Sequence, residues 1–148
     1  MELPIIQHVI PQRYPYLYVD KVLEITKQHR IVAIKNVSAN EPIFQGMVAD
    51  ELIFPETAIL ESLFQAASLL VITSSGSPGQ KVGLSAIKKS TFIRPVIAGD
   101  QLRLECEIRK TKEHVVLMAC EAIVDGQRVC SVEYELNLMQ MPSRPQIH

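Results

Sequence analysis

Glu61 is the residue of this sequence best placed to do chemistry. It is the one charged side chain between Glu56 and Lys81, in a stretch of mostly apolar and small residues. A carboxylate in such surroundings is costly unless it is hydrogen bonded, and it is usually kept for proton transfer or specificity. Gln65 follows one helical turn later, where it would either orient the Glu61 carboxyl or make a core hydrogen bond.

Metal binding is the alternative that the neighbouring acids raise. Asp50, Glu51 and Glu56 precede Glu61, but no histidine lies near them and the spacing within a loop is unconstrained. We therefore expect no metal and no cofactor. The four histidines are expected to be plain surface or turn residues: His8, His29, His114 and His148.

Composition limits the class of protein. The chain has 148 residues, of which 47% are hydrophobic and 21% charged, with a net charge of -1, so a disordered chain and a strongly basic nucleic-acid binder are both excluded. No basic secretory segment opens the sequence, and the longest apolar run is interrupted at Glu61 and Gln65. The three cysteines, Cys106, Cys120 and Cys130, have no C-x-x-C spacing. We expect them to be core residues of a protein in a reducing compartment. We expect one cytoplasmic domain over residues 1–148.

The element that must position Glu61 is a helix. Pro55 suits the first helical position, and Glu56 and Thr57 suit the first turn. From Ala58 onward the helix is apolar nearly all round, which is typical of a buried helix and not of a surface one. The short run 74–79, rich in serine, glycine and proline, predicts a loop after it.

The rest of the chain is predicted to form mainly β-strands. Residues 17–25 and 31–37 predict a hairpin before the helix, and 44–54 look irregular. After the helix, turn residues separate four candidate strands at 82–92, 101–110, 115–124 and 128–138. In the last of these, Val129 interrupts an otherwise regular polar face. An antiparallel meander wrapped around one long central helix, an α+β fold, is the economical arrangement.

Several motifs are familiar. They include I-P-Q-R-Y-P at 10–15, V-D-K-V at 19–22, N-E-P at 40–42, F-Q-G at 44–46, I-L-E at 59–61, F-I-R-P-V at 92–96 and G-D-Q-L at 99–102. In this order they resemble the β-hydroxyacyl-ACP dehydratase family, the FabZ branch of the hot-dog fold. The resemblance implies a curved antiparallel sheet around a central helix, in at least a dimer whose sheets join edge to edge.

The family's catalytic pair is a histidine in a G-H-F-P-G loop and a helix carboxylate from the other subunit. The histidine handles the C2 proton of a 3-hydroxyacyl thioester, and the carboxyl assists departure of the hydroxyl group as water. Glu61 falls at the carboxylate position, but the histidine position is Met47, whose thioether cannot exchange a proton.

Further departures cluster around this pair. Glu56 stands where the family has a glycine whose N–H holds the thioester carbonyl, and a carboxylate there would repel a developing oxyanion. Gln12 stands where the family commonly has a histidine. The framework motifs are retained, so the pattern predicts lost or altered chemistry on a retained fold.

The resemblance also implies binding residues. For the substrate they are Gly46, Met47, Phe54, Glu56, Phe64 and Gln65. For the acidic surface of an acyl carrier protein they are Lys88, Lys89 and Arg94, with an ordinary solvated strand edge as the alternative.

Three hypotheses remain open. The first is a FabZ-like 3-hydroxyacyl-thioester dehydratase, a lyase of fatty-acid or polyketide-type synthesis, impaired when alone because its histidine is lost. The second is a non-catalytic acyl-thioester-binding or heterodimer subunit that lends Glu61 to a histidine-bearing paralogue. The third is a hot-dog thioesterase that uses Glu61. The expected partners are an acyl thioester on acyl carrier protein or CoA and further subunits, as a homodimer, a trimer of dimers or that heterodimer, with no nucleic acid and no membrane.

Overall fold

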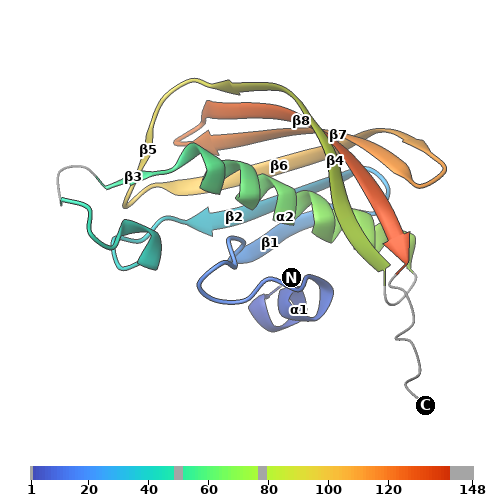
Figure 1. The fold of residues 1–148 in the computed structure, drawn as a ribbon, viewed down its shortest axis with the longest axis horizontal. Coiled ribbons are helices and arrows are strands. Elements are labelled where there is room, and N and C mark those ends of the chain that lie inside the picture. Colours follow the sequence, from blue (N-terminus) through green and yellow to red (C-terminus); the bar gives the residue numbers. More distant parts are fainter. Residues whose placement is uncertain (1, 49–51, 77–79, 141–148) are drawn as a thin grey trace, which may run out of the picture.

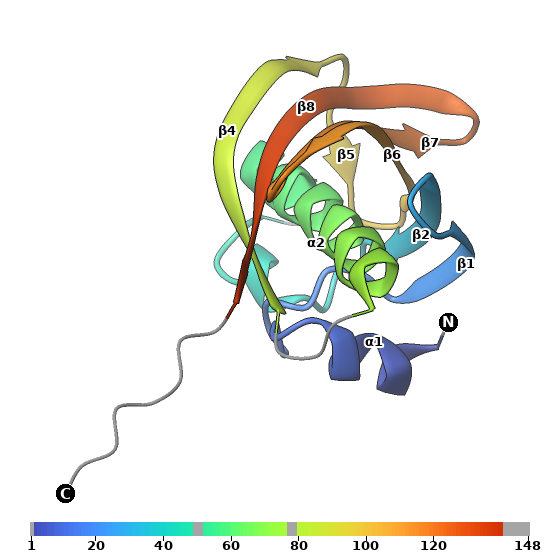
Figure 2. The same cartoon turned by 90° about the vertical axis from the view of Figure 1, so that its right-hand side faces the viewer.

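A six-stranded antiparallel sheet curves around one long helix (Figures 1 and 2). The computed structural model describes residues 2–48, 52–76 and 80–140. The sheet order is β1-β2-β6-β7-β8-β4, and the central helix is α2 (Glu56–Ser75). The strands of this sheet are β1 (Lys21–Thr26), β2 (Arg30–Asn36), β4 (Gln80–Phe92), β6 (Gln101–Lys112), β7 (Val115–Val124) and β8 (Gln127–Gln140). The α+β fold with a sheet around a central helix is thus confirmed.

Smaller elements close the two ends of the helix. The N-terminal helix α1 (Leu3–Val9) packs against α2. A 3-10 turn, η1 (Pro42–Phe44), lies near the start of α2, together with a two-stranded sheet of β3 (Ile53–Phe54) and β5 (Val96–Ile97) (Figure 1). The predicted irregular segment 44–54 therefore ends in a short strand.

The strand predictions are confirmed, with shifted bounds at the first hairpin. Residues 17–20 lie outside β1, and the Tyr18 backbone N–H donates to the Gln65 side chain on α2 instead of to a strand. β6, β7 and β8 form the expected meander, while β4 pairs with β8 and becomes an edge of the sheet.

A β-bulge explains Val129. On β7, Ala122 and Ile123 are consecutive, but their partners on β8 are Cys130 and Arg128, which leaves Val129 as the extra residue. The bulge turns two successive side chains inward, so Val129 and Cys130 are both buried. Beyond it, the alternation of buried and half-buried residues follows the predicted pattern to Asn137.

Two boundary predictions for the helix were wrong by a residue or two. Pro55 is the N-cap, with Glu56 the first helical residue, and Ser74 and Ser75 belong to the helix instead of the loop. Gly76 ends it in the left-handed region at φ 65°, where glycine has no steric penalty. Residues 77–79 of the predicted loop lie outside the described residues.

The curved sheet wraps around the helix, and most of the helix is buried (Figure 2). In the described part of the chain, α2 is also the one helix long and apolar enough to cross a membrane, contrary to the expectation that no segment would be. Most of its surface is instead covered by the sheet, as the helix of a soluble core would be. The Tyr134 hydroxyl on β8 donates to the Leu60 carbonyl, and the Cys106 thiol on β6 donates to the Leu63 carbonyl at 3.5 Å.

The three cysteines are buried and free, as expected. Burial first, and the carboxylate of Glu56 second, raise the pKa of the Cys130 thiol to about 11. Burial also raises the pKa of Tyr134, with smaller contributions from the neighbouring cysteines and Glu61. These groups are therefore protonated at neutral pH and contribute packing and donated hydrogen bonds.

We expect Tyr134→Phe to lower the free energy of unfolding by about 1 kcal/mol, because it removes the hydrogen bond between β8 and α2 while keeping the ring. Urea unfolding of the purified chain measures this. Tyr14→Phe is the matched control, since Tyr14 is 80% exposed. Equal stability of the two variants would contradict the anchoring role of the Tyr134 hydroxyl.

Candidate functional site

The Glu61 carboxylate is held by one side chain, Gln65. Within residues 2–48, 52–76 and 80–140, its hydrogen-bond partner is the Gln65 amide, which donates to Glu61 Oε1 at 3.0 Å, and no histidine bonds to it. The same amide donates to the Tyr16 carbonyl and accepts from the Tyr18 N–H, each at 2.7 Å. The sequence left open whether Gln65 orients the Glu61 carboxyl or makes a core hydrogen bond. In the structure its side chain does both.

The polar face of α2 changes in exposure along its length. Thr57 is exposed, Glu61 is half-buried, and Gln65 and Ser68 are buried. Ser68 donates to the Phe64 carbonyl one turn back. The carboxylate thus lies at the boundary between the open and closed parts of this face, where it can meet a ligand and still be fixed by Gln65.

Met47 lies between η1 and β3, in the segment that leads to the start of α2. It follows η1, and its backbone N–H donates to the Phe44 carbonyl at 3.0 Å. Gly46, just before it, has φ 87°, a conformation that residues other than glycine rarely adopt. The Met47 side chain is 40% exposed, so it is available to line a site.

A buried lysine secures this turn, a feature that the sequence analysis missed. Lys35 on β2 is 4% exposed and forms an ion pair with Glu41, which also accepts from the Ser38 N–H at 2.8 Å. The Lys35 ammonium lies over the rings of Tyr18 and Phe54, at 5.6 Å and 5.9 Å from their centroids.

The lysine and Glu61 are linked through Tyr18. The Tyr18 ring lies under the Lys35 ammonium, and its backbone N–H donates to Gln65, the partner of Glu61. Burial, and then the carboxylates of Glu41 and Glu61, raise the pKa of the Tyr18 hydroxyl. One continuous set of contacts therefore joins the loop that carries Met47 to the helix that carries Glu61.

Phe54 belongs to the same aromatic group. It is 1% exposed and packs edge-on against Tyr18 at 5.9 Å and tilted against Phe44 at 6.4 Å. Phe54 is thus buried beside the candidate site and packs against Tyr18 and Phe44. Its expected contact with substrate stays a prediction.

Glu56 begins α2 and is exposed. Its carboxylate is the acidic group of the first turn, and the Ala58 and Ile59 N–H groups both donate to the Pro55 carbonyl. A negative charge there is favourable for the helix dipole but unfavourable for an incoming oxyanion.

A cleft of about 650 Å³ runs beside α2. It is lined by the segment 7–13, by Phe64, Ser68 and Ile72 of α2, and by residues 80–82 at the start of β4. Phe64, a predicted substrate contact, packs edge-on against Tyr134 at 6.4 Å and faces this cleft. His8 is exposed as expected, but it also lines the cleft, which the sequence did not indicate.

The other titratable candidates lie elsewhere. His29 and His114 are exposed in hairpin turns. His148, Asp50 and Glu51 lie outside the described residues. In the described part of the chain, no group of three or more histidine, cysteine or acidic side chains is arranged to hold a metal ion.

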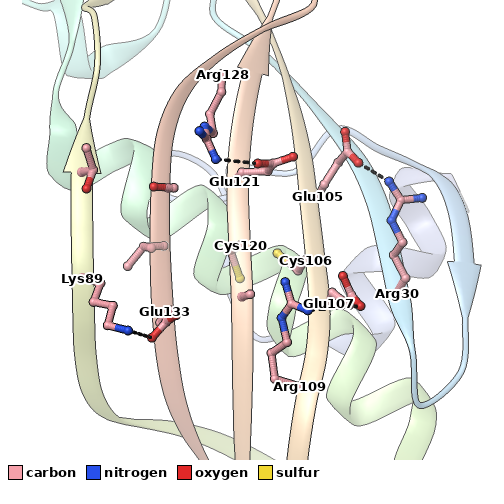
Figure 3. Close-up of a pocket in the computed structure, with 14 residues that line it drawn as sticks. Arg30, Lys89, Glu105, Cys106, Glu107, Arg109, Cys120, Glu121, Arg128 and Glu133 are labelled. Atoms are coloured by element: carbon pink, nitrogen blue, oxygen red, sulfur yellow. Dashed lines mark hydrogen bonds and ion pairs between the residues drawn. The ribbon is translucent and has the colours of Figure 1, made fainter.

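The outer face of the sheet carries a second hollow, of about 550 Å³ (Figure 3). Its four basic side chains each pair with an acid: Arg30 with Glu105, Arg109 with Glu107, Arg128 with Glu121, and Lys89 with Glu133. Opposite charges balance across the face, which is typical of a solvated surface. Nothing about it indicates a catalytic site.

The three predicted carrier-binding residues follow one strand and its end. Lys88 and Lys89 are exposed on β4 and lie 3.9 Å and 4.0 Å from Glu135 and Glu133 on β8. Arg94 follows β4 and is half-buried, and its Nε has no hydrogen-bond partner among the described residues.

Comparison with known families and sequences gives consistent matches. The family described as the FabA-like domain matches residues 10–133. The 3-hydroxyacyl-[acyl-carrier-protein] dehydratase FabZ of Aliivibrio fischeri is 43% identical over 130 residues, covering 86% of this chain and 87% of that protein. FabZ of Staphylococcus aureus is 41% identical over 128 residues, covering 86% and 88%.

Solved structures agree on the fold. The dehydratase heterocomplex ApeI:P from Xenorhabdus doucetiae matches with a TM-score of 0.76 at 11% identity, covering 94% of this chain and 91% of that one. A hot-dog-like protein from Thermanaerovibrio acidaminovorans matches with a TM-score of 0.64 at 16% identity, covering 78% and 84%. The hot-dog fold expected from the sequence is confirmed.

We expect Lys35→Met to lower the free energy of unfolding by about 3 kcal/mol, because it leaves the Glu41 carboxylate in a largely buried position without its cation. The double variant Lys35→Met with Glu41→Leu should recover much of this loss, since no charge is then stranded. Urea unfolding of the two single variants and the double variant tests this. If the double variant loses the sum of the single losses, the pair is not coupled.

Proposed function

Because this chain belongs to the FabA-like domain family and is a homologue of FabZ, we propose that it binds 3-hydroxyacyl thioesters of fatty-acid or polyketide-type synthesis with an incomplete catalytic pair. The observation that carries the proposal is the Glu61 carboxylate, fixed by Gln65 on a retained framework, while Met47 occupies the histidine position. Purified alone, the chain is expected to be a weak or inactive dehydratase.

The chemistry explains why one carboxylate is not enough. Dehydration removes a proton from C2 and delivers one to the departing 3-hydroxyl, which takes two proton-handling groups on either side of the substrate. Glu61 can supply one of them, near the hydroxyl. Met47 can shape the site but cannot accept the C2 proton, and Glu56 disfavours the negative charge that develops on the thioester oxygen.

A shared site would supply the missing group. β4 is an edge strand, and it exposes apolar side chains that are each more than 40% accessible, at Leu84, Ile87 and, just after it, Ile93. Unpaired edge strands of this length favour pairing with another chain. We propose that β4 pairs with a histidine-bearing paralogue, which would give a site made of that subunit's histidine and this chain's Glu61. The match to a dehydratase that is itself a heterocomplex supports this arrangement.

The cleft beside α2 fits the acyl chain. Its α2 residues follow Glu61 at helical spacing, and Phe64, Ile72 and Val82 give it an apolar lining. We further propose that Lys88, Lys89 and Arg94 meet the acidic carrier protein in the cytoplasm. The exposure of the Lys88 and Lys89 side chains, 54% and 81%, supports a contact with an acidic surface.

We expect the purified wild-type chain not to dehydrate a 3-hydroxyacyl-ACP measurably. Met47→His combined with Glu56→Gly should raise the rate at least about 100-fold, because it restores a proton-transfer group and removes the opposing charge. Formation of the conjugated enoyl thioester, followed by absorbance, measures the rate. Met47→Gln with Glu56→Gly is the matched control, since glutamine has a similar size but cannot take the proton. Wild-type turnover at rates typical of enzymes, lost on Glu61→Gln, would refute the proposal of an incomplete pair.

A complementation experiment tests the shared site. A paralogue that retains G-H-F-P-G is first inactivated by replacing its own helix carboxylate with the amide, and is then co-purified with this chain. We expect the mixed complex to regain dehydratase activity, because Glu61 supplies the missing carboxyl. This chain with Glu61→Gln should form the same complex, by size-exclusion chromatography, without activity. Equal activity with and without the Glu61 carboxyl would exclude its contribution.

A further inference from the structure

The cleft beside α2 is lined by basic residues without any acidic ones. Arg13, Lys81 and His8 line it, and among the described residues that line it there is no aspartate or glutamate. The whole chain has 16 acidic residues against 15 lysines and arginines, so composition alone does not produce this one-sided lining. Charge of one sign in a concave site raises the local concentration of ligands of the opposite sign. This cleft is therefore suited to an anion.

Ion pairs do not neutralise these basic side chains. The Arg13 guanidinium donates to three backbone carbonyls of the segment 7–12, at 2.5 to 2.8 Å. The carbonyls fix its position but carry no negative charge. None of the salt bridges between described residues involves Arg13, Lys81 or His8. In the hollow on the outer face of the sheet, by contrast, each basic side chain has an acid as its partner.

The charged and the apolar groups of the cleft differ in their exposure. Arg13, Lys81 and His8 are exposed, so their polar groups stay in contact with water. Five apolar side chains that line the same cleft are buried or half-buried: Val9, Ile10, Phe64, Ile72 and Val82. The volume of the cleft, about 650 Å³, is within the usual range of small-molecule sites. A ligand with an anionic head and a hydrocarbon tail would satisfy both sets of groups.

A carboxylate is the anion that the three basic side chains match. The backbone carbonyls use three of the five N–H donors of Arg13, which leaves two for a ligand. Lys81 adds a second cation, and His8 supplies a ring N–H in either neutral tautomer. Hydrogen bonds from cationic N–H groups to a carboxylate are roughly twice as strong as neutral ones. An inorganic anion would leave the apolar lining uncovered, and an uncharged hydrocarbon would leave the cations unmatched.

We propose that this cleft binds the anion of a fatty acid, with its carboxylate at Arg13 and Lys81 and its alkyl chain along the apolar lining. The inference goes beyond the proposed function, because it requires neither a thioester nor Glu61, which does not line the cleft. An acyl thioester whose chain enters the same cleft would compete with the fatty acid. Free fatty acid would thereby limit how much of the protein holds a thioester.

The test uses octanoate and 1-octanol as probes, because they have the same chain length and differ in the charge of the head group. Isothermal titration calorimetry of the purified full-length chain measures both affinities. We expect octanoate to bind about tenfold more tightly, since it alone can pair with the cations. Raising the salt concentration from roughly 0.05 M to roughly 0.5 M should weaken the binding of octanoate but not of 1-octanol, because salt screens the charges.

Lys81→Glu is the decisive variant, because Lys81 is exposed and its replacement leaves the core intact. It should lower the affinity for octanoate at least about tenfold and keep the affinity for 1-octanol. Lys110→Glu is the matched control, since Lys110 is an exposed lysine of β6 outside the cleft and the net charge changes equally. Arg13→Gln should also lower the affinity for octanoate, and a thermal melt checks that this variant is folded.

Three results would overturn the inference. They are no saturable binding of octanoate by wild type, equal affinities of wild type for the two probes, and an equal loss of octanoate affinity in Lys81→Glu and Lys110→Glu. None of them affects the proposed function, which is tested on thioesters. A chain that binds octanoate but no acyl thioester would overturn the proposed function and support this inference.

Discussion

The three hydrogen bonds of the Gln65 side chain are the contacts on which the candidate site depends. The amide of this residue joins Tyr16 and Tyr18, from a segment without regular structure, to Glu61 on the central helix. Burial makes these hydrogen bonds important for stability, because a buried amide that loses them cannot bond to water instead. The carboxylate is consequently fixed in direction while its free side remains accessible. A site that acts on a substrate needs both properties.

The Lys35–Glu41 pair gives the Met47 loop comparable support. A buried lysine is tolerated only where a carboxylate and aromatic faces replace its hydration, and Glu41, Tyr18 and Phe54 do this here. Tyr18 belongs to both groups of contacts, so the loop and the helix are held by one shared segment. The contacts that hold the Met47 loop and those that hold the Glu61 helix are therefore both present in this chain.

This separation of framework from chemistry is the main functional lesson. The residues that build the site, Gln65, Lys35 and the aromatic cluster, are all engaged in the structure, whereas the departures from the dehydratase pattern fall on Gln12, Met47 and Glu56. The Lys35–Glu41 pair stabilises the fold as well as the candidate site, so it is kept whether or not the chemistry is.

The sequence by itself determined the elements and the family. The apolar girdle of 58–72, the alternation of 130–138 and the turn residues between strands are local patterns, and local periodicity decides which faces are buried. It also singled out Glu61 and the substitution at Met47. Only the tertiary structure decided that β4 pairs with β8 at an edge, that the Lys35 ammonium lies over two aromatic rings, and that segments 7–13 and 80–82 line one cleft. These contacts join residues far apart in the chain, and which distant side chains meet depends on how the sheet curves around the helix, which no local pattern encodes.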